Sequence, residues 1–218
     1  MKQKSIMRSK NILLYLVTIL VVLSVSTAVV FADGGYVDGH LFLSNVRAVQ
    51  AYGTMQPVDM GTQQNQVWTN IQIYYDYYHF VEFGIIRIGK GMSVSQYYYA
   101  AWGDGSARHT WNIGTINNNQ HNFRIESNNG YDWYFYLDGS QVFYAYCPMV
   151  SYSISAMTEI NYALGSSSGT LVSNWQALQY KISGGSWTYW TSIIPADVSP
   201  YLTVSKNEIT HSVNSYVQ

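Results

Sequence analysis

The stretch from Tyr74 to Trp102 reads YYDYYHFVEFGIIRIGKGMSVSQYYYAAW. It contains two runs rich in aromatic and β-branched residues, which are typical of strands. The runs flank Gly89-Lys90-Gly91, a short glycine-containing connection. This pattern predicts two antiparallel strands joined by a tight turn. The rest of the chain can be organised around this predicted hairpin.

Glu82 is the unusual residue in the first of these strands. Side chains alternate between the two faces of a strand, so Glu82 shares one face with Phe80, Gly84 and Ile86. Arg87 falls on the opposite face, with Val81, Phe83 and Ile85. Each face therefore has one charged group among apolar neighbours. A buried carboxylate is costly unless it is paired or protonated, which marks Glu82 as a candidate functional residue.

The first 32 residues have the features of an export signal. Lys2, Lys4, Arg8 and Lys10 form a basic region, residues 12–30 are almost entirely apolar, and 30–32 fit a small-residue cleavage site. We expect a hydrophobic signal helix that is removed, with an uncleaved membrane anchor as the alternative. Both interpretations predict a secreted or cell-surface protein.

The remaining 186 residues can form one domain with a substantial core. After loss of the basic segment they carry seven Lys and Arg against 12 Asp and Glu, which argues against nucleic acid and anionic membranes as partners. Membrane contact is then expected only through an uncleaved N-terminal segment. Cys147 is the single cysteine, so the chain can form no internal disulfide.

The pattern of short runs predicts an all-β, antiparallel two-sheet sandwich or jelly roll. Turn signals recur every 8 to 12 residues, and no helix is predicted after residue 32. We expect an irregular N-terminal segment at 33–44 and a sandwich domain at 45–194. The C-terminal tail, 195–218, is expected to be a loose extension or to add one edge strand at Tyr201 to Val204.

The search for chemistry points to carboxylates. The five histidines have no zinc-ligand spacing, no multi-Asp loop supports calcium, and neither a metal nor a cofactor is predicted. Of four glutamates, only Glu82 and Glu159 lie inside predicted strands rich in apolar and small residues. Two carboxylates on one face can act as an acid–base pair. The alternative is that each simply faces solvent on the wet side of a sheet.

Aromatic residues are the second lead. Tyr97 to Tyr99, and the run from Tyr131 to Tyr136, place aromatic rings on both faces of their strands. Only one face of each strand can belong to the core. Exposed Tyr and Trp can stack on sugar rings or promote self-association, and partly buried Tyr with satisfied hydroxyls is the alternative.

Several short motifs, taken in order, resemble the glutamic peptidases of the eqolisin type, which have a concanavalin-like double-sheet fold. The matching segments are Gly53-Thr54-Met55-Gln56-Pro57, Val67-Trp68-Thr69-Asn70-Ile71, Val81-Glu82-Phe83-Gly84, Tyr99-Ala100-Ala101-Trp102 and Ala156-Met157-Thr158-Glu159. In that family the third carries the catalytic Gln and the last the catalytic Glu. Here Glu82 stands at the position of the Gln, an arrangement similar to the Glu pair of neprosin-type peptidases. Residues 133–139 also resemble an aromatic strand and Asp-Gly turn of laminin-G and legume-lectin-like sandwiches.

The resemblance implies an acid-active endopeptidase. Glu159 would activate water as general base, and a protonated Glu82 would hold the substrate carbonyl. Trp68, Tyr97, Tyr99 and Trp102 would contact the substrate. Two further hypotheses remain open: a non-catalytic module that binds glycan or cell-wall polymer, and a surface-structural or self-associating protein. The partner is accordingly expected to be a polypeptide or a glycan.

Overall fold

The computed structural model describes residues 35–218, except 77, 150 and 152. The predicted signal helix lies outside the described residues. These residues form strands, turns and loops with no helix, and none of them belongs to a segment that could cross a membrane as a helix. The strands are β1 (Gly35–Phe42), β2 (Val46–Met55), β3 (Asn65–Asp76), β4 (His79–Lys90), β5 (Ser93–Asp104), β6 (Arg108–Thr115), β7 (His121–Glu126), β8 (Asp132–Leu137), β9 (Ser140–Tyr146), β10 (Ser153–Ile160), β11 (Leu171–Ile182), β12 (Thr188–Tyr189), β13 (Ile194–Asp197), β14 (Leu202–Asn207) and β15 (Ser212–Val217).

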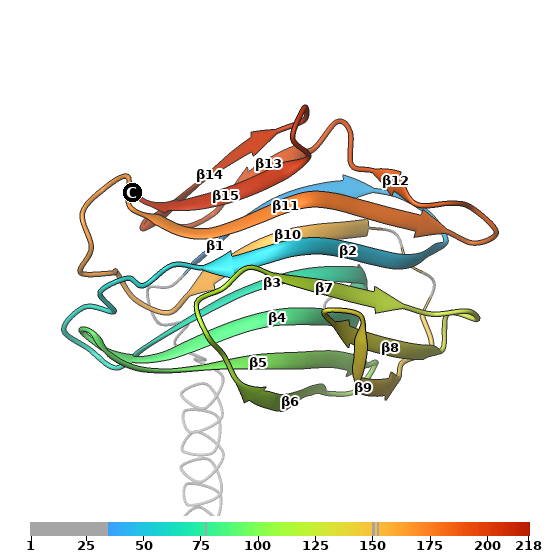
Figure 1. Ribbon diagram of the computed structural model, residues 1–218, viewed down its shortest axis with the longest axis horizontal. Coiled ribbons are helices and arrows are strands. Elements are labelled where there is room, and N and C mark those ends of the chain that lie inside the picture. Colours follow the sequence, from blue (N-terminus) through green and yellow to red (C-terminus); the bar gives the residue numbers. More distant parts are fainter. Residues whose placement is uncertain (1–34, 77, 150, 152) are drawn as a thin grey trace, which may run out of the picture. The chain divides into compact units, whose positions relative to one another are not determined.

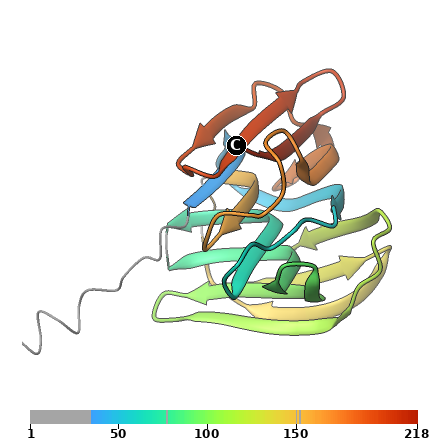
Figure 2. The ribbon, with the colours of Figure 1, turned by 90° about the vertical axis from the view of Figure 1, so that its left-hand side faces the viewer.

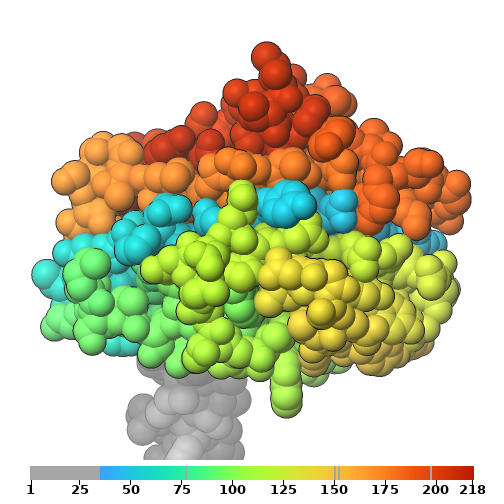
Figure 3. All heavy atoms as spheres, viewed as in Figure 1, coloured from blue at the N-terminus to red at the C-terminus, as the bar shows by residue number. Residues whose placement is uncertain are grey.

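Two antiparallel sheets pack face to face, as the sequence predicts (Figures 1 and 2). One has the order β13–β1–β10–β3–β4–β5–β6. The other has the order β14–β15–β11–β2–β7–β8–β9, with β12 added beside β11. Figure 3 views the molecule from the side of this second, eight-stranded sheet, with the β7–β9 region in lime to yellow.

The core lies between the sheets and is rich in aromatic rings. Phe83 of β4 meets Phe123 of β7 edge to face at 4.9 Å between ring centroids, and Phe123 meets Trp175 of β11 at 5.2 Å. The Trp175 indole N–H donates to the Thr69 hydroxyl across the sandwich at 2.7 Å. This buried hydrogen bond links β11 of one sheet to β3 of the other and favours one register of the two sheets.

The central hairpin forms as predicted, with β4 and β5 joined at Gly91. Asp138 and Gly139 also form the expected tight turn, and both have positive φ angles, 49° and 83°. A two-residue turn with positive φ at both positions matches the twist of the strands that it joins.

The segment expected to be irregular at 33–44 is instead largely the strand β1. It pairs with β10 on one side and β13 on the other. Gly39 is required by packing, since a Cβ there would lie 2.5 Å from a methyl of Val213 and 2.8 Å from one of Ile193. The glycine that suggested a loop therefore permits close contact between the sheets.

The C-terminal tail is more ordered than the sequence suggests. Residues from 194 onward supply β13, β14 and β15, and Leu202, Val213 and Val217 are buried. Strand β14, which contains most of the predicted edge strand, lies at the end of its sheet. The tail thus completes both sheets, because its apolar side chains alternate with polar ones and can pack into the core.

Candidate active site

Glu82 lies on the outer face of the seven-stranded sheet, the side opposite the core. Val81, Phe83 and Ile85 of the same strand point inward and are fully buried. The alternation predicted for this strand is therefore confirmed. Glu82 is opposite Gln72 on β3 and Ala101 on β5. Its side chain is only 1% exposed, so its charge is largely removed from water.

Glu159 projects from the same outer face. Its strand, β10, places Ile154, Ala156 and Ile160 in the core, which directs Glu159 to the other side. Glu159 is opposite Trp68 on β3, the strand between β10 and β4. Unlike Glu82, it is partly exposed. The fold therefore brings both predicted carboxylates to one surface.

The two glutamates flank the middle of the sheet and do not bond to each other. Their partners on β3, Trp68 and Gln72, are four residues apart, a backbone offset of about 13 Å along the strand. Among the described residues no hydrogen bond joins the two carboxyl groups, although Glu159 contributes to raising the pKa of Glu82. A substrate bond would thus have to lie between them.

Gly84 occupies the position between the two carboxylates. It is opposite Asn70 on β3 and Tyr99 on β5. A Cβ at Gly84 would lie 1.9 Å from the backbone oxygen of Thr69, so no larger residue fits without moving the strand. Gly84 therefore allows β3 and β4 to approach each other closely at the point between the two glutamates.

Asn70 and Tyr99 form a buried polar pair beside Glu82. The Asn70 amide donates to the Tyr99 hydroxyl at 3.0 Å, and Tyr99 is hydrogen-bonded to Glu82. Both side chains are 1% exposed. The Asn70 carbonyl oxygen is buried and has no partner among the described residues. An unsatisfied buried acceptor is costly, and it marks a place where a bound water or ligand could donate a hydrogen bond.

Arg108, on the edge strand β6, is the main residue that the sequence analysis missed. Its guanidinium forms a short ion pair with the Glu82 carboxylate and lies 5.1 Å from the centre of the Phe80 ring. Its side chain remains 48% exposed. The local sequence gives no signal of this contact, because Arg108 follows a polar turn that resembles an ordinary surface loop. The contact becomes visible only when β4, β5 and β6 are paired side by side in the sheet.

Burial and Arg108 have opposite effects on the two carboxyl groups. The pKa of Glu82 is raised to about 6, because burial and the nearby Glu159 raise it by more than Arg108 lowers it. Burial also raises the pKa of Glu159, against the lowering effect of Arg108. Both groups therefore take up protons in weakly acidic solution, more readily than a free glutamate does. Shifted carboxyl groups of this kind occur often at functional sites.

The predicted substrate-binding aromatics divide between the two faces. Trp68, Tyr97 and Tyr99 lie on the outer face with the glutamates, and Tyr99 is buried. Trp102 does not lie on this face. It is three positions after Tyr99 on β5, and side chains an odd number of positions apart point to opposite faces of a strand. It packs 5.2 Å from Phe143 and thus belongs to the core side.

Asp38 and His40 are further polar residues of β1 that the sequence analysis placed in an irregular segment. They are 3.4 Å apart, and Asp38 is opposite Met157, which puts it on the outer face near Glu159. Burial raises the pKa of Asp38. In the described part of the chain, no three His, Cys, Asp or Glu residues are grouped as a metal site.

The architecture defines a concanavalin-type double-sheet sandwich with paired glutamates on one face. Scytalido-glutamic peptidase, solved with a peptide-based transition-state analogue, has a similar structure: the TM-score is 0.64 at 11% identity, over 85% of this chain and 98% of that one. SCP-B, a member of the eqolisin family solved with the tripeptide Ala-Ile-His, gives a TM-score of 0.55 at 11% identity with the same coverage. At this identity the likeness establishes a shared fold. No protein-family model and no curated protein sequence matches the chain.

Proposed function

We propose that this protein is a glutamic-peptidase-like hydrolase that cleaves polypeptides at weakly acidic pH. The observation that carries the proposal is the unequal pair of glutamates on one sheet face. Glu82 is buried and paired with Arg108, whereas Glu159 is partly exposed. Two carboxyl groups in different environments can divide the acid and base roles. The fold shared with peptidases is consistent with this assignment.

In the proposed mechanism Glu159 is the general base. It accepts a proton from a water molecule, whose oxygen then attacks the peptide carbonyl carbon above Gly84. The carbonyl oxygen becomes negatively charged, and Arg108 donates an N–H to it. When the carbonyl re-forms, the C–N bond breaks, and Glu159 returns the proton that it accepted from water to the leaving amine nitrogen. Below the Glu82 pKa of about 6, that carboxyl group is protonated and Arg108 loses its anionic partner. The cation is then free to stabilise the developing charge, which is why activity requires acid.

The decisive experiment compares three variants on a denatured protein such as casein, over a pH series that ends just below the Glu82 pKa of about 6, where Glu82 is protonated and part of Glu159 is still ionised. Glu159→Gln removes the base and should abolish cleavage. Glu82→Gln should keep part of the activity, because a neutral amide replaces a neutral acid. Glu208→Gln, an exposed glutamate far along the chain, is the control. Full activity in both site variants, or no cleavage by the wild type, would refute the proposal.

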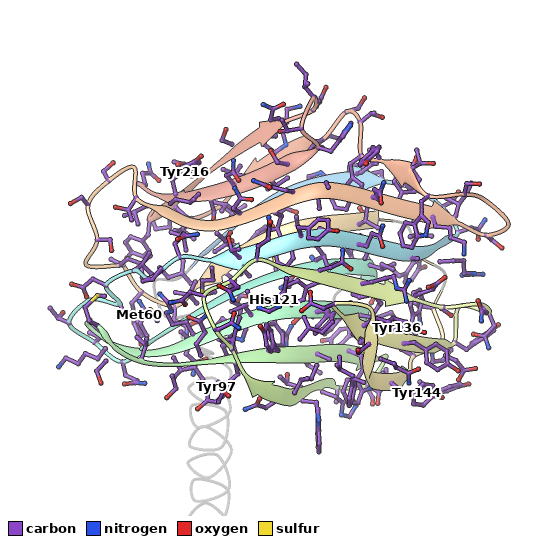
Figure 4. All side chains as sticks on the ribbon, viewed as in Figure 1. Met60, Tyr97, His121, Tyr136, Tyr144 and Tyr216 are labelled. Carbon is purple, nitrogen blue, oxygen red and sulfur yellow. The ribbon has the colours of Figure 1, made fainter. Side chains whose placement is uncertain are left out.

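Glycan binding is a second candidate, favoured by exposed aromatic rings on the other sheet. Tyr131, Tyr144 and Tyr146 are 44–59% exposed. The ring centroid of Tyr144, which Figure 4 labels, lies 5.4 Å from that of Tyr134. Exposed rings of this kind can stack on sugars. Retention on insoluble polysaccharide that is lost in Tyr144→Ala would support this function, and lack of retention on every polymer would count against it. Either function fits export through the N-terminal segment, which remains part of the proposal.

A further inference from the structure

A second polar site lies on the core side of β4, at the end of the sandwich near the β4–β5 turn. It is a pocket of about 440 Å³ between β4, β5 and the segments that follow β2 and β6. Tyr97, labelled in Figure 4, is one of its lining residues. Its volume suits a small organic molecule. Tyr97 is the one predicted substrate-contacting residue that also lines the pocket. Neither Glu82 nor Glu159 lines it, so the pocket is distinct from the pair of glutamates.

Arg87 lines this pocket and is a buried cation with no anionic partner among the described residues. Its side chain belongs to a residue that is 2% exposed. The guanidinium donates from Nε to the Gln96 side-chain oxygen at 2.8 Å, from Nη2 to the same oxygen, and from Nη1 to the Gln56 carbonyl at 2.7 Å. Burial alone lowers its pKa, with no opposing contribution from a carboxylate. A buried charge that lacks a counter-ion is costly, because neutral acceptors offset only part of its lost hydration.

The hydrogen bonds leave unused donors at the same place. A guanidinium has five N–H groups, and the bonds from Arg87 use three of them. The Gln96 amide nitrogen is buried and has no partner among the described residues. Its orientation is fixed, since the reversed amide would place N–H groups against the guanidinium. Beside the pocket, two N–H groups of Arg87 and the amide nitrogen of Gln96 thus have no acceptor among the described residues.

The walls of the pocket limit the kind of ligand. Val58, Met92, Val94 and Ile116 provide apolar surface around the single cation. A planar carboxylate matches the fork of an arginine, and one negative charge balances one positive charge. A doubly charged phosphate would leave one charge unbalanced against apolar walls. We propose that this pocket binds a small organic carboxylate, with its charged group at Arg87 and Gln96 and its carbon chain against the apolar wall.

The test is calorimetric titration of the full-length chain, held in a mild nonionic detergent, with butyrate, butyramide and inorganic phosphate at neutral pH. Butyrate should bind at least about tenfold more tightly than butyramide, which has the same shape without the charge. It should also bind at least about tenfold more tightly than phosphate. Comparable binding of butyramide would remove the role of the cation. Comparable binding of phosphate would overturn the assignment to a carboxylate.

Two variants examine the site independently. Arg87→Met removes the cation, and Val94→Trp fills the pocket while leaving the cation in place. Val94 is 37% exposed, so the larger ring can be accommodated without repacking the core. Each should weaken butyrate binding by at least about tenfold. Lys90→Met removes a cation from the exposed end of the same strand, outside the pocket, and should leave the affinity within about twofold. Unchanged affinity in the folded Val94→Trp variant, or no binding by the wild type up to about 50 mM butyrate, would overturn the proposal.

Discussion

Replacing Glu82 with Gln should change how stability depends on pH, and the size of the effect follows from the burial of the carboxyl group. The pKa of Glu82 is raised from 4.5 to about 6 in the folded protein. Its proton is therefore held more tightly in the folded than in the unfolded state. Below about pH 4.5 the group is neutral in both states and costs nothing. As the pH rises through 6 the buried group ionises, and the folded state loses stability.

The magnitude comes from the difference in pKa. A shift of about 1.5 units corresponds to about 2 kcal/mol, at about 1.4 kcal/mol for each unit. Wild-type protein should lose this amount between about pH 4 and pH 7, whereas Glu82→Gln should not. The useful quantity is the difference between the two proteins at each pH, because titration of the histidines is common to both and cancels.

Urea unfolding followed by tryptophan fluorescence measures this difference directly. The free energy of unfolding of Glu82→Gln should gain about 2 kcal/mol on the wild type as the pH rises. Glu208→Gln is the control, since that glutamate is exposed and forms a surface ion pair with Lys206 at 2.8 Å. Its difference should stay within about 0.5 kcal/mol. If the Glu82→Gln difference is constant or has the opposite sign, Arg108 outweighs burial, and the acid-dependent mechanism proposed above loses its basis.

Three further substitutions address the parts of the site and the core. Arg108→Met removes the counter-ion of Glu82 and should lower the free energy of unfolding by about 1–3 kcal/mol at neutral pH. At acid pH, where Glu82 is neutral, the loss should be small. An equal loss at both pH values in urea unfolding would contradict the ion pair. Gly84→Ala places a methyl 1.9 Å from a β3 backbone oxygen and should cost more than about 3 kcal/mol by thermal unfolding. Gly185→Ala is the control and should cost below about 1 kcal/mol, because its methyl meets mainly the exposed Ile182 side chain, which can move, and its nearest backbone atom is an oxygen at 3.4 Å. Trp175→Phe deletes the buried hydrogen bond between the sheets and should cost about 1–3 kcal/mol in the same assay, so a neutral result would show that this bond does not stabilise the sandwich.

Local patterns in the sequence were sufficient to predict much of the fold. The run around Gly89-Lys90-Gly91 and the Asp138-Gly139 turn each specify a hairpin through residues next to one another in the chain. Period-two alternation also separated Glu82 from Val81, Phe83 and Ile85, the residues of the same strand that the structure places in the core. These predictions succeeded because strand alternation and turn geometry depend on neighbouring residues.

The missed features depend on contacts between distant segments. Gly39 was interpreted as a loop residue. It lies in β1, at a position where the Val213 side chain of the other sheet leaves no room for a Cβ. Trp102 was assigned to the substrate face from a family motif, although strand alternation opposes that assignment. Arg108 lies 26 positions from Glu82 in the chain, and only the order of β4, β5 and β6 makes them neighbours. No pattern in a single sequence indicates such a pairing.

The contact with Arg108 changes the chemistry available to a pair of glutamates. With two carboxyl groups alone, a protonated carboxyl group would have to donate the hydrogen bond to the substrate carbonyl oxygen. Here a half-exposed cation stands beside the buried member, and its availability follows the protonation of Glu82. When Glu82 is ionised, the guanidinium is occupied and the site holds a net negative charge with Glu159. When Glu82 takes up a proton, the same guanidinium can donate hydrogen bonds to a substrate.

Activity should therefore rise as the pH falls toward the pKa of Glu82. It should decline again once Glu159 is protonated, giving a bell-shaped profile whose alkaline limb is absent in Glu82→Gln. An alkaline limb that persists unchanged in that variant would assign the proton-controlled step to another group.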